Sequence, residues 1–182
     1  HDGELALALG RSRTERRWRP VTLAWSELLG RLAAPVRTEE SLAEFLAAPK
    51  AAQDAKKDVG GYVGGTLKEG RRTGASVAWR TCLTLDADFA TDDLLFALDL
   101  RPWAWALHST RKHRAGAMRL RLVVPLARAV TAEEYPAIAR KVADQLGIEQ
   151  FDDTTYEPHR LMYWPSCSRD AEFLFQHQDG PW

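Results

Sequence analysis

Two carboxylates stand two residues apart where an apolar stretch ends, Asp86 and Asp88 in the run Leu83–Asp88. Side chains two positions apart in an extended strand point to the same face, so both carboxylates are expected to face one site. Close together and unpaired they repel each other, which favours a hard divalent cation such as Mg²⁺ or Mn²⁺ between them. From this motif alone, a turn in which an aspartate caps a helix is an equally good interpretation.

A basic segment follows and runs into a strand-like stretch. Neutral His113 can donate a hydrogen bond to a phosphate oxygen, and Lys112 or Arg111 can neutralise the charge of a triphosphate. Arg119 and Arg121 alternate with apolar residues, so both are expected to point to one face. Basic side chains facing a carboxylate site are what a nucleoside triphosphate pocket needs. A solvent-exposed basic strand face is the alternative.

The stretch Phe151–Ser166 is the most distinctive in the chain. Asp152 or Asp153 is positioned to supply the third carboxylate that usually completes a divalent metal site. Arg160 can hold a phosphate or pair with Asp152, and the first interpretation is slightly favoured. The aromatic pair Tyr163–Trp164 can stack on a base, although packing in the core is favoured for it. His108, from the preceding basic segment, is interpreted as structural.

The elements that must position these residues follow from hydrophobic periodicity and from helix caps. Strands are predicted at 80–86, 103–107, 118–125, 161–164 and 172–175, with a helix capped by Thr91 and another running from the Thr131/Glu134 capping box to Gly147. The order β-α-β-β-α-β is that of a ferredoxin-like, or RRM-like, α+β unit. Its spatial strand order, 4-1-3-2, would bring Asp86, Asp88, His113 and Asp152 to one edge of the sheet.

Residues 1–76 carry no motif and are expected to form an N-terminal αβ module before an RRM-like module at 77–182. Within them, 1–20 read as polar and partly irregular, 21–25 as a strand, and 38–48 as a helix capped by Thr38. Glycines between 60 and 74 indicate a hairpin or strand edge rather than a phosphate loop. Because the chain begins with His1, it is expected to be a fragment of a longer protein.

Composition is that of an ordinary globular protein, with 182 residues and a formal net charge of zero. Positive charge is concentrated in blocks at 11–19, 71–80 and 111–121, and solvated faces are the alternative interpretation of such runs. Cys82 and Cys167 are the only cysteines, which is typical of a reduced, cytoplasmic protein. No apolar run is long enough for a membrane span, so no membrane association is expected.

Taken together, the Asp-x-Asp motif, the Ser109–His113 segment and the hydrophobic-Asp pair Phe151–Asp152 resemble the three motifs of the archaeo-eukaryotic primase (AEP) superfamily. Residues 77–178 look more closely like the primase-polymerase domains of phage and mobile-element replication proteins. The phrases Arg119–Leu126 and Arg160–Ser166 carry that closer match.

The resemblance implies a DNA primase or primase-polymerase, a nucleotidyltransferase that uses NTPs or dNTPs on a single-stranded DNA template and primer. It implies that Asp86, Asp88 and Asp152 bind Mg²⁺ or Mn²⁺, as two ions, and that His113 contacts the incoming nucleotide. The full set of expected nucleotide contacts is Ser109, Arg111, Lys112, His113, Arg119, Arg121 and Arg160. A helicase domain is expected on the same chain or on a partner chain. No zinc ligands are recognisable, which leaves primer extension better supported than de novo initiation.

Two other function classes stay open from the sequence. A metal-dependent nuclease would use the same carboxylates with water as the nucleophile. A non-catalytic RRM-like module would bind nucleic acid through exposed aromatic residues on its central strands. The predicted central strands instead carry aspartates and arginines, which argues against that module.

Overall fold

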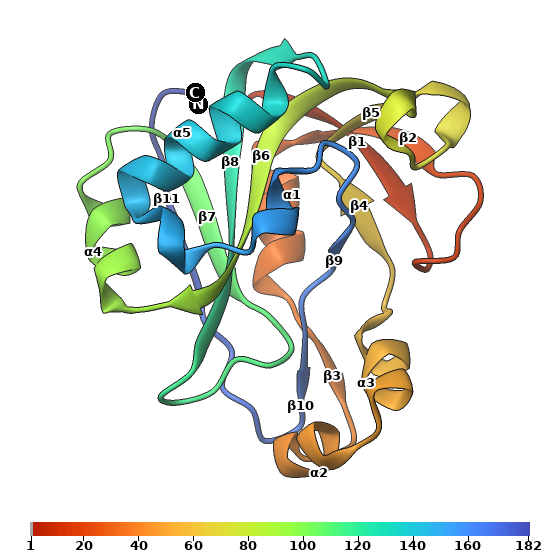
Figure 1. The fold of residues 1–182 in the computed structure, drawn as a ribbon, viewed down its shortest axis with the longest axis vertical. Helices are drawn as coiled ribbons and strands as arrows, with labels where there is room; N and C mark the ends of the chain where they lie inside the picture. The colour runs from red at the N-terminus through yellow and green to blue at the C-terminus, as the bar shows by residue number, and fades with distance from the viewer. Residues whose placement is uncertain (1) are drawn as a thin grey trace.

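The computed structural model describes residues 2–182 (Figure 1). Its strands are β1 (Glu4–Gly10), β2 (Arg19–Ala24), β3 (Val36–Thr38), β4 (Gly61–Val63), β5 (Gly65–Leu67), β6 (Val77–Ala90), β7 (Trp105–Ser109), β8 (Met118–Val130), β9 (Met162–Tyr163), β10 (Ser166–Ser168) and β11 (Phe175–Gln178). Its α-helices are α1 (Trp25–Ala33), α2 (Leu42–Ala47), α3 (Lys50–Lys57), α4 (Asp92–Asp99) and α5 (Tyr135–Leu146). The fold is therefore α+β, as predicted.

A five-stranded antiparallel sheet, in the order β11-β7-β8-β6-β5, forms the centre of the fold. Alternate residues of β6 and β8, such as Leu85 and Leu122, turn to one face and pack against α4 and α5. Burial of this apolar layer is the main favourable contribution to folding. Figure 1 shows these two helices together on one side of the sheet, and they leave its opposite face for the other elements.

The opposite face is covered by α1 and by a second, four-stranded sheet in the order β2-β1-β4-β9. Leu5 and Leu7 of β1 and Leu28 of α1 are fully buried there, against residues such as Val123 of β8. Cys82 of β6, Ala106 of β7 and Val123 of β8 are the buried apolar residues of the central sheet that pack in this layer. Further along the same strands this face carries polar residues of β6, β7 and β8, and a cavity opens over them.

The predicted order of the central elements is confirmed: β6, α4, β7, β8 and α5 follow one another, and β7-β8-β6 are neighbours in the sheet. The capping box before α5 is present, because Glu134 N–H donates to Thr131 Oγ1 at 3.2 Å and Thr131 N–H donates to Glu134 Oε2 at 2.8 Å. Gly147 ends α5 with φ of 97°, a left-handed conformation that favours glycine.

The predicted place of the fourth strand is wrong. β9 pairs with β4 in the four-stranded sheet, and β5 occupies part of the edge of β6. Further along this edge, Asp152 N–H donates to Asp86 C=O at 2.9 Å and Asp86 N–H donates to Thr155 Oγ1 at 2.8 Å. The segment 152–155 thus satisfies the open edge of β6 without being a strand, since buried backbone groups need partners of some kind.

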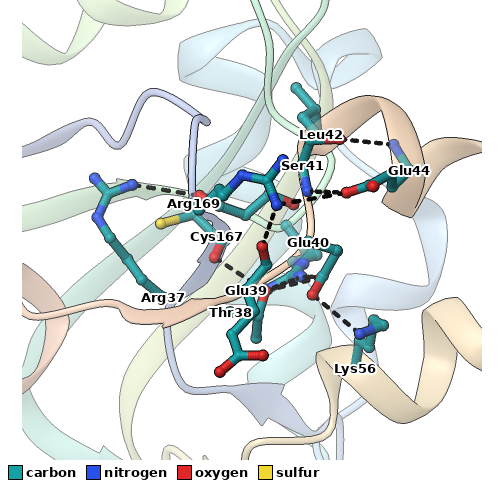
Figure 2. A network of polar contacts seen from close by, with 12 residues as sticks. Arg37, Thr38, Glu39, Glu40, Ser41, Leu42, Glu44, Lys56, Cys167 and Arg169 are labelled. Atoms are coloured by element: carbon teal, nitrogen blue, oxygen red, sulfur yellow. Dashed lines mark hydrogen bonds and ion pairs between the residues drawn. The ribbon is translucent and has the colours of Figure 1, made fainter.

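Two predictions for the N-terminal residues need correction. The prediction that 1–20 are partly irregular holds for 11–18, which lie outside any helix or strand, but residues 4–10 form the strand β1, whose alternating leucines are the signal. Thr38 does not cap a helix; it ends β3, and Ser41 caps α2 by accepting from Glu44 N–H at 3.1 Å. Figure 2 shows this region, where Thr38 Oγ1 instead donates to Glu40 Oε1 at 2.8 Å.

The boundary predicted between residues 76 and 77 stays a prediction. Strands from its two sides pair with each other, β5 with β6, β4 with β9, and β3 with β10. Gly65 lies so close to β6 that an added Cβ would meet Trp79 C=O at 2.0 Å, so only glycine allows this approach. Among the helices of residues 2–182, none is long and apolar enough to cross a membrane.

Candidate active site

A cavity of about 420 Å³ opens over the polar end of the central sheet. Its floor comes from β6, β7 and β8, and one wall comes from the segment around β9. Another wall comes from the N-terminal half of the chain. The residues that line it are Arg13, Lys57, Arg72, Asp86, Asp88, His108, Thr110, Arg111, Lys112, Arg119, Arg121, Arg160, Leu161, Tyr163, Trp164, Pro165 and Ser166.

The floor contains a row of three side chains on adjacent strands. Asp86, Arg121 and His108 are cross-strand neighbours in the register of β6, β8 and β7. Arg121 Nε donates to Asp86 Oδ1 at 2.7 Å, and its Nη1 donates to Tyr163 C=O at 2.7 Å. Burial lowers the pKa of Arg121, but the Asp86 charge outweighs this, so the pKa lies above its ordinary value. The pair is a fixed, desolvated ion pair.

A second, more exposed pair lies one step further along the same strands. Arg119 Nη1 contacts Asp88 Oδ2 at 2.8 Å, with side chains 31% and 34% exposed. Asp86 and Asp88 therefore face the same cavity, as the period of two in β6 predicts, but each carboxylate has an arginine partner. The period of two in β8 predicts that both arginines face this side of the sheet, but it does not predict that they pair with the aspartates.

The basic turn after β7 holds His113 and Lys112. Arg119 N–H donates to His113 Nδ1 at 3.2 Å, so the ring proton of neutral His113 belongs on Nε2. Burial lowers the pKa of His113, which favours this neutral form. Lys112 lines the cavity, and burial together with the nearby charges of Lys57 and Arg119 lowers its pKa. His113 is buried beside the turn and does not line the cavity.

Arg111 lies at the cavity wall but is held by the structure around β3 and α2. Its Nη2 donates to Thr38 and Glu40, and its guanidinium lies 4.6 Å from the centre of the Phe45 ring. Burial raises the pKa of Glu40, but hydrogen bonds from Lys56 and Thr38, together with the charge of Arg111, outweigh this and lower the pKa to about 2. Figure 2 shows Lys56 and Thr38 beside Glu40. Arg111 thus joins the turn after β7 to the N-terminal residues.

The remaining predicted site residues lie outside the cavity or at its rim. Asp152 does not line the cavity; its Oδ1 accepts from Thr154 N–H at 2.9 Å, and its Oδ2 lies 3.8 Å from Arg160 Nη2. Ser109 is buried and its Oγ accepts from Leu174 N–H at 3.0 Å. Arg160 both lines the cavity and approaches Asp152. Within residues 2–182, no three carboxylate, histidine or cysteine side chains gather as a metal site.

Sequence reasoning missed the contribution of the N-terminal half to this site. Arg13, Lys57 and Arg72 line the cavity from the β1–β2 hairpin, α3 and the segment before β6. Arg13 is fixed through its backbone N–H, which donates to both Asp58 carboxylate oxygens at 2.9 and 3.0 Å. Two of the three belong to basic blocks visible in the sequence, but nothing local indicates that those blocks meet Arg121 in space.

His108 was interpreted as structural, yet it too lines the cavity. It is 1% exposed, its Nδ1 lies 2.9 Å from Ser109 C=O, and its Nε2 has no hydrogen-bond partner in the described part of the chain. Burial, followed by the nearby Arg121 charge, lowers its pKa to about 3. The ring is therefore neutral, with a proton on Nδ1 and an acceptor on Nε2.

This burial predicts a loss of stability in mild acid. Below the ordinary pKa of 6.5 the unfolded chain protonates His108, whereas the folded chain stays neutral until about pH 3. Stability therefore falls as the pH drops through this window, by at most about 1.4 kcal/mol per pH unit for one proton. Urea unfolding of wild type and His108→Asn at several pH values measures the difference. Parallel pH profiles for the two proteins would contradict the prediction.

Comparisons with known proteins bear on the identity of the chain. A search of curated proteins returns no match. Among solved structures, the AEP domain of the primase-polymerase of cyanophage S-2L is similar, with 16% sequence identity and a TM-score of 0.46 over 96% of this chain and 80% of that chain. The model of the VapE N-terminal domain family matches residues 1–182. The chain belongs to the VapE N-terminal domain family.

Proposed function

We propose that this domain is the catalytic part of a primase or primase-polymerase that acts in the replication of a phage or mobile element. In this reaction a 3′-hydroxyl attacks the α-phosphate of a bound nucleoside triphosphate, the new phosphodiester bond forms, and pyrophosphate leaves. One observation carries the proposal: a single cavity combines two carboxylates on its floor with basic side chains on its floor and walls. The positive potential of these basic side chains attracts a polyphosphate and orients it over the carboxylates.

Each of the two carboxylates has one oxygen available to bind a divalent cation. Arginine holds Oδ1 of Asp86 and Oδ2 of Asp88, and within residues 2–182 no contact engages the other oxygen of either carboxylate. Ligating carboxylates are commonly held in this way by a hydrogen bond to their second oxygen. Mg²⁺ or Mn²⁺ bound by these two residues would supply Lewis-acid stabilisation of charge on the reacting phosphate. Asp152 lies outside the cavity, so the proposal is confined to one ion.

The chain's own residues have distinct tasks in this proposal. Lys112 and Lys57 lie at the wall and can neutralise phosphate oxygens, while Arg121 fixes the carboxylate of Asp86. His113 holds the backbone of Arg119, and its direct contact with the nucleotide stays a prediction. The preorganised charges of this cavity favour the transition state because they need no rearrangement as negative charge develops.

Primer extension with labelled nucleotides on a single-stranded template, in Mg²⁺ and in Mn²⁺, tests the proposal. We expect template-dependent extension, and a Lys112→Ala variant whose KM for the nucleotide rises about tenfold or more, the loss that one hydrogen bond between charged groups predicts. Lys141→Ala, an exposed change on α5, is the matched control and should leave the KM unchanged. Absence of both extension and nucleotide binding by calorimetry would overturn the proposal. Shortening of the primer would indicate a nuclease instead.

A further inference from the structure

A second hollow, of about 640 Å³, lies on the four-stranded sheet beside the β1–β2 hairpin. Three arginines of this hairpin line it, Arg11, Arg17 and Arg19, with Glu15 as the one acidic residue. They belong to the first basic block of the sequence, and the proposed reaction gives none of these three arginines a role. The chain as a whole has zero net charge, so this concentration of positive charge is a local feature.

Most of this charge is free to meet a ligand. Arg17 and Arg19 are exposed and make no ion pair within residues 2–182, whereas Arg11 pairs with Glu15 at 3.0 Å. Between the two free arginines, Trp18 is buried and 1% exposed, whereas its neighbours at 17 and 19 are exposed. Arg19 is the first residue of β2, and Arg17 lies in the loop just before it. Trp18 fixes this part of the loop, because its backbone N–H donates to Gly70 C=O at 2.8 Å and its Nε1 donates to Glu15 C=O at 3.1 Å.

Trp164 connects the two hollows, because it lines both of them. Its ring centre lies 4.7 Å from that of Tyr62, and the guanidinium of Arg31 lies 5.6 Å from its ring. The side chain is only partly buried, so part of the indole faces the hollows. An aromatic ring beside a line of basic side chains is the combination by which proteins bind single-stranded nucleic acid, through stacked bases and neutralised phosphates.

We propose that the β1–β2 hairpin binds the phosphate backbone of a single-stranded nucleic acid, which passes Trp164 to enter the first cavity. This inference deepens the proposed function by assigning a path to the template strand, and it rests on that function for the direction of the path. Arg17 and Arg19 contact phosphates, Trp164 stacks on a base, and Arg13, from the same hairpin, continues the basic track into the first cavity.

Fluorescence anisotropy with labelled oligothymidylate and oligouridylate of about 20 nucleotides, longer than the site of one small binding domain, tests the inference. We expect Arg17→Ala/Arg19→Ala to weaken binding about tenfold or more at low salt. The slope of log K against log salt should fall in magnitude by about 1.4, or about 0.7 for each lost phosphate contact. Arg128→Ala/Lys141→Ala, which removes two exposed charges away from both hollows, should change neither quantity.

Two further measurements keep this inference separable from the proposed function. Nucleotide binding by calorimetry is expected to be unchanged in the hairpin variant, since Arg17 and Arg19 do not line the first cavity. Trp164→Phe should retain more oligonucleotide affinity than Trp164→Leu, because only an aromatic ring can stack. Oligonucleotide binding that survives in the hairpin variant with an unchanged salt slope overturns the inference, whatever the nucleotide result. Binding to anionic phospholipid vesicles but not to oligonucleotides overturns it as well.

Discussion

Asp86→Asn is expected to reduce nucleotidyl transfer strongly and also to destabilise the fold, whereas Asp88→Asn is expected to reduce transfer equally with little loss of stability. Both substitutions remove a negative charge from the floor of the cavity, and each should lower kcat by about 1,000-fold, which corresponds to several kcal/mol of transition-state stabilisation. The two substitutions differ in how deeply the arginine partner of each aspartate is buried. Arg121 is 6% exposed and would lose the one carboxylate that pairs with it within residues 2–182.

The expected loss of stability follows from this difference in burial. Breaking the buried pair of Asp86 and Arg121 should lower the free energy of unfolding by about 3 kcal/mol, because a desolvated cation is left without its counter-charge. The pair of Asp88 and Arg119 is about one-third exposed, so its loss should cost less than about 1 kcal/mol. Solvent screens the second pair and leaves its charges hydrated.

Urea unfolding and primer extension on the same preparations separate the two effects. Asp144→Asn, an exposed change on α5 next to Lys141, is the matched control and should affect neither measurement. Full transfer activity in Asp88→Asn would remove that carboxylate from the proposed reaction. An unfolding free energy of Asp86→Asn equal to that of the wild type would show that Arg121 does not depend on this partner.

The parts of the fold that were predictable are those in which local sequence and tertiary packing agree. The alternating leucines of β6 and β8 face α4 and α5, and the Thr131/Glu134 box starts α5 at the expected position. In these segments the period of the apolar residues and the helix caps depend only on residues two to four positions apart in the sequence. The placement of Asp86 and Asp88 on one face came from the same period.

The errors concern pairings between distant residues. Short strands such as β4 and β9 have no pattern that names a partner, and their pairing depends on the close approach that Gly61 permits to Met162 C=O. The edge of β6 could have been covered by a strand, yet the turn at 152–155 satisfies it equally well. Which of these arrangements forms depends on the packing of the whole chain, and local periodicity does not predict it.

Among the candidate site residues, too, those set by local sequence were predicted and those set by distant contacts were not. The aspartates and arginines of β6 and β8 were found because their positions in the strands determine their direction. Arg111 has the residue type of a phosphate ligand, but Glu40 and Thr38, from more than seventy residues earlier, engage it in a structural contact. His108 was interpreted as structural, and it is indeed buried, but this burial leaves its Nε2 at the cavity without a hydrogen-bond partner among the described residues.

Arg80 is the residue outside the cavity whose substitution should have the largest effect. It is fully buried and has no carboxylate partner in the described chain; its guanidinium donates to Gly64 C=O at 2.9 Å, Pro158 C=O at 2.7 Å and Cys82 C=O at 3.1 Å. It also donates to Thr84 Oγ1 at 2.9 Å and lies 4.0 Å from the centre of the Tyr135 ring. The guanidinium of Arg80 thus joins β6 to Gly64, just before β5, and to the loop that leads to Arg160.

Arg80→Lys keeps the charge but is expected to lower the free energy of unfolding by about 3 kcal/mol, because one ammonium cannot reach acceptors arranged around a planar fork, and two or more hydrogen bonds are lost. Release of Pro158 should also loosen Arg160 and raise the KM for the nucleotide. Arg101→Lys is the control: Arg101 also donates to backbone carbonyls but is only partly buried, so its loss should cost less than about 1 kcal/mol. Equal unfolding free energies for the two variants would mean that charge alone, rather than the geometry of the guanidinium, holds this junction together.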